Sequence, residues 1–145
     1  SALGVGEGAP SNYLRSKTAG EAALKAQRGL ELTILRPSVI FGAEDRFLNL
    51  FASLQKVFPL MPLAGASARF QPVWVGDVAR ALVHCLDDRR TIGQTYECAG
   101  PQVYTLAELV RLAGRLSGHP RLVLPLPEAL GRLQALAMEC LPGQP

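Results

Sequence analysis

The chain has 145 residues, 48% hydrophobic and 19% charged, which fits one folded domain with a sizeable core and excludes a disordered protein. Its net charge is only +3 and its basic residues are interleaved with acidic ones, which excludes the basic stripe of a nucleic-acid-binding protein. No apolar run approaches the ~20 residues that a membrane span requires, so we expect no transmembrane segment and a cytoplasmic location.

Three cysteines, Cys85, Cys98 and Cys140, lie far apart in the sequence. Neither they nor His84 and His119 show the spacing of a zinc site. We therefore expect no metal centre, and we expect reduced thiols that are mostly buried, as in a cytosolic protein.

The chain opens with a glycine-rich loop, Gly4-Val5-Gly6-Glu7-Gly8. It resembles a dinucleotide fingerprint only superficially, because no strand precedes it and Pro10 interrupts it before the first helix. Ser11 or Asn12 is the expected cap of that helix, which we place at residues 13–28. The spacing of four alanines predicts its buried stripe: Ala19, Ala22, Ala23 and Ala26.

Near the start of this helix, Tyr13 and Lys17 are four residues apart, so their side chains should project from one face. A phenol is a poor acid or base at neutral pH, and a fixed cation beside it favours the phenolate. The pair suits proton transfer to or from a hydroxyl or carbonyl. The spacing alone fits equally a tyrosine and a lysine on a solvated helix face.

The next element, Leu32–Leu35, has the continuous apolar character of a strand buried on both faces, as in parallel sheets. Residues 36–42 follow as the turn at its carboxyl end, where open α/β sheets bind ligands. Residues 94–99 are its main parallel neighbour. Because an apolar edge is usually covered, we expect upstream strands or a second copy of the chain to complete the sheet.

The remaining pattern alternates helices and strands, which indicates an α/β fold. An Asp cap, a Thr-x-x-Glu capping box and a proline at a first turn mark three of the helix starts. In chain order we expect a helix at Arg46–Phe58, a loop at 59–68, a strand at Arg69–Val75, a helix capped by Asp77, a strand at Gln94–Ala99, a helix capped by Thr105, a strand at Leu122–Leu124 and a helix from Pro127.

Four ordered motifs carry a family resemblance: Tyr13-x-x-x-Lys17, Leu-Arg-Pro-Ser-Val-Ile-Phe-Gly at 35–42, Val-Trp-Val-Gly-Asp-Val-Ala at 73–79 and Thr-Tyr-Glu-Cys-Ala-Gly at 95–100. Together they resemble the extended and atypical short-chain dehydrogenase/reductase superfamily. Residues 13–17 and 40–49 are similar to the subgroup of the NAD(P)H-binding accessory subunit of respiratory complex I and its bacterial homologues.

This resemblance covers only the C-terminal half of such a protein, so we expect the sequence to be a fragment. It implies a Rossmann-type extended fold with a small α/β substrate domain. The implied domains are the end of the NAD(P)-binding Rossmann domain at 1–43, a substrate-domain insertion at 44–76, a return to the Rossmann domain at 77–100, and a truncated substrate domain at 101–145.

The resemblance also implies roles for individual residues. Tyr13 would be the catalytic acid/base, Lys17 would bind the cofactor ribose and lower the phenol pKa, and Ser1 would supply the active-site hydroxyl. The other implied contacts are those of Pro37, Ser38 and Val39 with the nicotinamide, and of Arg46 with the substrate.

Two functions remain open on this basis. One is hydride transfer between NAD or NADP and an unknown alcohol or carbonyl. The other is a non-catalytic NAD(P)H-binding subunit, with a respiratory complex or a second copy as partner and a peripheral position at the inner membrane. A weaker alternative is sugar-nucleotide epimerisation or dehydration.

Overall fold

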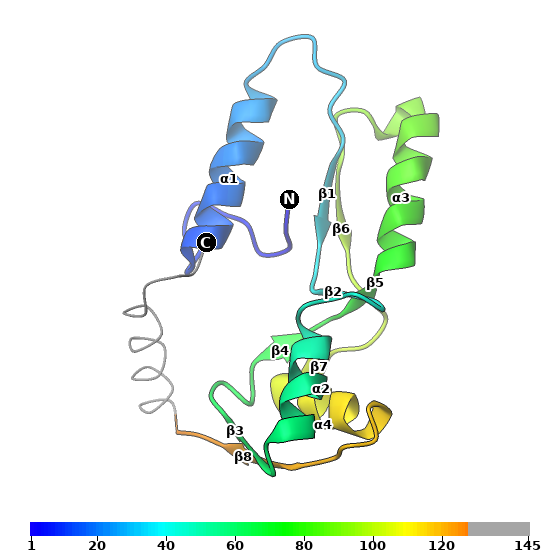
Figure 1. Ribbon diagram of the computed structural model, residues 1–145. Coiled ribbons are helices and arrows are strands. Elements are labelled where there is room, and N and C mark those ends of the chain that lie inside the picture. The colour runs from blue at the N-terminus through cyan, green and yellow to red at the C-terminus, as the bar shows by residue number, and fades with distance from the viewer. Residues whose placement is uncertain (128–145) are drawn as a thin grey trace. The chain divides into compact units, whose positions relative to one another are not determined.

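The computed structural model describes residues 1–127, so the helix expected from Pro127 onward and Cys140 lie outside the described residues. Helices and strands alternate along the chain (Figure 1). In order they are α1 (Asn12–Lys25), β1 (Ile34–Pro37), β2 (Ile40–Phe41), α2 (Leu48–Val57), β3 (Leu60–Leu63), β4 (Arg69–Phe70), β5 (Val73–Trp74), α3 (Val75–Asp87), a 3₁₀ turn (Arg89–Thr91), β6 (Thr95–Cys98), β7 (Tyr104–Thr105), α4 (Leu106–Leu116) and β8 (Leu122–Pro125).

The chain forms two compact units, each built from separate stretches of sequence. Unit 1 comprises Ser1–Gly42 and Gln71–Gln102, and unit 2 comprises Ala43–Phe70 and the chain from Val103 onward. Both contain parallel strand pairs packed with helices, which confirms the expected α/β fold class.

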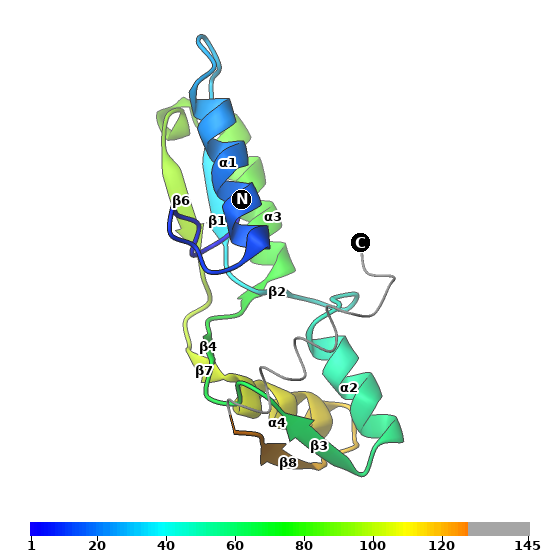
Figure 2. The same cartoon turned by 90° about the vertical axis from the view of Figure 1, so that its left-hand side faces the viewer.

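Unit 1 is a sandwich of three layers. Its central layer is the parallel pair β1–β6, with Ile34 opposite Thr95, and α1 and α3 lie on its two faces (Figures 1 and 2). This confirms the predicted pairing with residues 94–99, although the strand begins two residues later than expected. Within residues 1–127, β6 is the only strand paired with β1, and the second neighbour stays a prediction.

Helix α1 begins as predicted but presents a different face to the sheet. The Ser11 hydroxyl accepts a hydrogen bond from the Leu14 N–H at 3.2 Å, and the helix ends at Lys25, before the predicted boundary. The predicted alanine stripe is wrong, because Ala19, Ala22, Ala23 and Ala26 are all exposed. The only buried residue of α1 is Glu21, whose carboxylate pairs with an arginine of β1 and so turns that face inward.

The predicted strand at 69–75 is in fact two short strands. β4 pairs with β7 in unit 2, whereas β5 pairs with β2 in unit 1. Pro72, which lies between them and has no N–H to donate to a ladder, explains the break.

Helix α3 starts earlier than the sequence suggests. The prediction that Asp77 caps this helix is wrong. Asp77 lies in the first turn, where its carboxylate pairs with the Arg80 guanidinium. Trp74, which precedes the first turn of the helix, is 46% exposed. Its ring lies beside the Arg80 guanidinium, 5.4 Å from the ring centroid.

Unit 2 is built on the parallel pair β3–β8 and the helices α2 and α4. Its buried cluster contains Met61, Leu63, Ala107, Val110 and Val123. The loop predicted at 59–68 therefore contains a strand, whose alternate residues point into this core. Pro62, a usual sign against a strand, lies at an exposed position of it.

The helix α4 confirms a local prediction. The Thr105 hydroxyl accepts from the Glu108 N–H at 3.2 Å, and the Glu108 carboxylate accepts from the Thr105 N–H at 2.7 Å. This reciprocal pair is the capping box expected from the sequence. In the same unit the aromatic rings of Phe47 and Phe51 pack edge to face, with centroids 5.4 Å apart.

The contact between α2 and α4 predicts a size limit at Gly114. A Cβ there would overlap the amide oxygen of Gln55, a fully buried side chain whose Nε2 donates to the Val110 carbonyl at 2.9 Å. We expect Gly114→Ala to lower the free energy of unfolding by about 1–2 kcal/mol, measured by urea denaturation.

The matched control is Gly20→Ala in α1, where no atom lies within 4 Å of the added Cβ. That substitution should raise the free energy of unfolding by about 0.5–1 kcal/mol. Equal effects of the two substitutions would contradict the predicted overlap.

Candidate functional site

Tyr13 and Lys17 lie on one face of α1, as the spacing predicts. The Lys17 ammonium is 5.5 Å from the centroid of the Tyr13 ring. Tyr13 is 59% exposed, so its hydroxyl is accessible to a reacting molecule. The helix thus holds an exposed phenol and a cation side by side on one face.

A groove of about 460 Å³ lies between α1 and strand β1. We call it the β1 groove; its lining residues are Ser1, Ser16, Lys17, Gly20, Glu21, Leu24, Leu32, Thr33, Ile34, Leu35 and Leu82. Two of the predicted site residues, Ser1 and Lys17, therefore meet at one groove. Its polar side chains come mostly from the N-terminal segment and α1, and its apolar ones come from residues 32–35, from Leu24 of α1 and from Leu82 of α3.

A buried carboxylate links these elements. Glu21 is 7% exposed and accepts hydrogen bonds from Arg36 Nε at 2.8 Å and Arg36 Nη2 at 2.7 Å. The Ser1 hydroxyl donates to the same carboxylate at 2.5 Å, and the Lys25 ammonium lies 3.5 Å from it. Glu21 thus joins helix α1 to strand β1 and to the N-terminal segment.

Sequence reasoning did not single out Glu21. The signal that could have found it is its position four residues after Lys17, on the same helix face, together with an arginine inside an otherwise apolar strand. An arginine at such a place needs an anionic partner.

The hydrogen bond from Arg36, with that from Ser1 and the charges of Arg36 and Lys25, lowers the pKa of Glu21 to about 2, although burial acts in the opposite direction. The same carboxylate raises the pKa of Arg36 above its ordinary value. The pair is therefore fully ionised at neutral pH.

The turn after β1 is held by backbone hydrogen bonds. The Leu3 N–H donates to the Pro37 carbonyl at 2.8 Å, and the Ser38 N–H donates to the Cys98 carbonyl at 2.8 Å. The Val39 carbonyl accepts from the Val73 N–H at 2.9 Å. These bonds fix the path of residues 37–39, the segment expected to meet a nicotinamide, at the carboxyl end of β1.

The remaining predicted residues are placed elsewhere. Arg46 is exposed and belongs to unit 2, so it is not part of the β1 groove. The loop at 4–8 is tied to α1, because the Gly6 N–H donates to the Thr18 hydroxyl at 3.0 Å. The loop is therefore held against α1, the helix that follows it in the chain.

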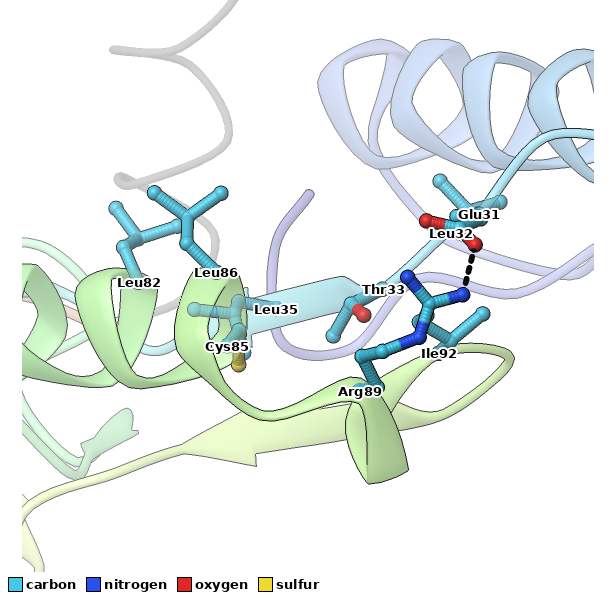
Figure 3. Close-up of a pocket in the computed structure, with 9 residues that line it drawn as sticks. All are labelled: Glu31, Leu32, Thr33, Leu35, Leu82, Cys85, Leu86, Arg89 and Ile92. Atoms are coloured by element: carbon cyan, nitrogen blue, oxygen red, sulfur yellow. Dashed lines mark hydrogen bonds and ion pairs between the residues drawn. The ribbon is translucent and has the colours of Figure 1, made fainter.

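A second pocket, of about 580 Å³, lies between α3 and β1 (Figure 3). Leu82 and Leu86 extend from α3 on one side of it, and an ion pair between Glu31 and Arg89 at 2.5 Å lies at the other (Figure 3). None of the predicted site residues lines it. Its lining is mainly apolar.

Residues 1–127 contain neither a candidate membrane span nor a candidate metal site. No helix there is long and apolar enough to cross a bilayer. That part of the chain also has no group of three His, Cys, Asp or Glu side chains able to hold a metal ion.

Residues 3–79, more than half of the chain, match the model of an NAD-binding domain family described as Male sterility protein. A mitochondrial relative from Arabidopsis thaliana, NADH dehydrogenase (ubiquinone) 1 alpha subcomplex subunit 9, is 42% identical over 133 residues, which cover 89% of this chain and 33% of the relative. The Mus musculus protein of the same name is 38% identical over 119 residues, covering 81% and 31%. The chain thus spans about a third of the length of these relatives.

Solved structures give the same fold. A dTDP-4-dehydrorhamnose reductase from Bacillus anthracis in complex with NADP superposes with a TM-score of 0.71 and 20% identity. The matched region covers 81% of this chain and 41% of that enzyme. The described units therefore have the fold of part of a Rossmann-type reductase.

The Glu21–Arg36 pair predicts a pH-dependent stability. Glu21 titrates near 4.5 when unpaired and near 2 in the fold. Its contribution is thus complete above pH 4.5 and is lost as the pH falls toward 2. We expect Glu21→Gln to lower the free energy of unfolding by about 2–3 kcal/mol at pH 7, measured by urea denaturation.

Wild type and Glu21→Gln should become equally stable as the pH approaches 2, because the protonated carboxyl then resembles the amide. The control is Glu31→Gln, which breaks an ion pair whose carboxylate is 60% exposed and should change stability by about 0.5 kcal/mol or less. A difference between wild type and Glu21→Gln that is independent of pH would contradict the linkage.

Proposed function

Because the chain belongs to the NAD-binding family described as Male sterility protein, within the short-chain dehydrogenase/reductase superfamily, we propose that it is part of an NAD(P)(H)-dependent oxidoreductase. The observation that carries the proposal is the Tyr13–Lys17 pair, with Lys17 opening onto the β1 groove. The reaction is hydride transfer to or from an alcohol or carbonyl carbon.

Each residue of the pair has a separate task. The dinucleotide, when bound, supplies or accepts the hydride. The Tyr13 hydroxyl gives a proton to the carbonyl oxygen during reduction, and its phenolate takes one from the alcohol during oxidation. The Lys17 ammonium stabilises the phenolate and donates to the ribose hydroxyls.

The described residues fit the nicotinamide–ribose half of the cofactor. Residues 37–39 form a rigid backbone turn at the carboxyl end of β1, and Lys17 offers its ammonium from α1. The pyrophosphate half would need a glycine-rich turn between a strand and a helix N-terminus. In residues 1–127 no strand leads into such a turn.

We further propose that unit 1 is the dinucleotide-binding part and that unit 2 is the substrate part, with Arg46 as a substrate contact. Under this proposal Ser1 contributes its hydroxyl to the substrate oxygen. The Ser1 hydroxyl donates its hydrogen to Glu21, and its oxygen can still accept a hydrogen bond from the O–H group of an alcohol substrate.

A second candidate function rests on the names of the relatives. Both curated proteins are subunits of mitochondrial NADH dehydrogenase. In this alternative the protein holds NAD(P)H without turnover, as a structural subunit placed peripherally at a membrane complex. The large exposed fraction of Tyr13 is compatible with a pair that is never covered by substrate.

One substitution, Tyr13→Phe, distinguishes the two candidate functions. In the full-length protein, Tyr13→Phe should abolish NAD(P)H turnover with carbonyl substrates, by a factor of about 10² or more, and leave NADPH affinity unchanged. Lys17→Met should weaken NADPH binding, measured by nicotinamide fluorescence. Binding without any turnover, in wild type and in Tyr13→Phe alike, would favour the structural subunit.

A further prediction concerns the 145-residue chain itself. It should bind NADPH and NADH weakly or not at all, because a pyrophosphate cradle provides much of the affinity for a dinucleotide. Isothermal titration of the isolated chain measures this directly. Low-micromolar binding would contradict the prediction and would show that residues 1–145 suffice.

A further inference from the structure

We propose that Glu21 is a positioning residue of the oxidoreductase site, which holds Ser1 and the strand β1 in register with the Tyr13–Lys17 face of α1. The inference rests on the proposed function. In this role Glu21 contacts neither the cofactor nor the reacting atoms. It acts through the three segments that it holds together: the N-terminal segment, α1 and β1.

The Glu21 carboxylate is held in a defined geometry. Arg36 donates two near-parallel hydrogen bonds, one to each carboxylate oxygen, and this bidentate form fixes both distance and angle. Ser1 donates a third to Oε1. A carboxylate with three defined donors and 7% exposure has little freedom to move.

The groups that donate to Glu21 belong to segments of the proposed site. Arg36 is followed directly by residues 37–39, the turn assigned to the nicotinamide. Ser1 is the candidate active-site hydroxyl. Glu21 lies one helical turn beyond Lys17, and all of Ser1, Lys17 and Glu21 line the β1 groove. One side chain thus connects the three segments that carry the proposed site.

The residue type at position 21 also favours a positioning role. An alanine or leucine would suit a position that only packs α1 on the sheet, whereas the one buried position of α1 holds Glu21. A buried ion pair is a costly way to hold a helix, and apolar replacements of such pairs are often as stable. The pair therefore gains its value from the geometry that it imposes.

The experiment uses the full-length protein and separates positioning from stability. The main variant is Glu21→Met/Arg36→Leu, which replaces the ion pair by two apolar side chains. The second is Glu21→Gln, a nearly isosteric change, measured at 10 °C so that the protein remains folded. Glu31→Gln is the matched control, since Glu31 pairs with Arg89 outside the β1 groove.

Two quantities are measured for each variant: the urea midpoint, and the affinity for NADPH and NADH from nicotinamide fluorescence. We expect Glu21→Met/Arg36→Leu to keep a midpoint near that of wild type and to lose about tenfold or more in dinucleotide affinity, because small misplacements of binding groups are costly. Glu21→Gln should lose affinity while folded, Glu21→Asp should recover part of it, and Glu31→Gln should change neither quantity.

The outcomes distinguish this inference from the proposed function. Wild-type affinity in both Glu21→Gln and the folded double variant would overturn the positioning role and leave the proposed function intact. Affinity that falls only in proportion to the unfolded fraction would assign Glu21 a purely structural role and would also overturn it. A wild-type protein that binds neither dinucleotide would overturn the proposed function and this role together.

Discussion

The attraction between the Glu21 carboxylate and the Arg36 guanidinium is the constraint on which unit 1 depends. It decides which face of α1 meets the sheet, since the only buried side chain of that helix is charged. The alanines are left on the solvent side as a consequence, and Lys17, which shares a helix face with Tyr13, lines the β1 groove.

The features that could be predicted from the sequence depend on residues that are close together in the chain. The Thr105–Glu108 capping box and the Ser11 cap depend on residues three apart, and both were found as expected. The Tyr13–Lys17 pair depends on one helical turn and was equally predictable. The family resemblance was also confirmed, because its motifs are short and ordered. These signals are local, so the sequence contains all of the information that they need.

The failures share the opposite property. Glu21 meets Arg36 only after the chain has folded back from α1 to β1, so helical periodicity alone favoured the alanine stripe. Strand β3 was hidden by Pro62, which is harmless there because its position is exposed and its missing N–H is not needed. In each case a tertiary neighbour outweighed a local tendency.

The division of the chain into two interleaved units has a consequence for how the protein acquires its fold. The paired strands β1 and β6, and likewise β3 and β8, are separated by about sixty residues of sequence, so the contact order is high and folding should be slow. During synthesis, β1 leaves the ribosome long before β6 exists. The pairing of β1 with β6 therefore has to wait until the second stretch of unit 1 has been synthesised.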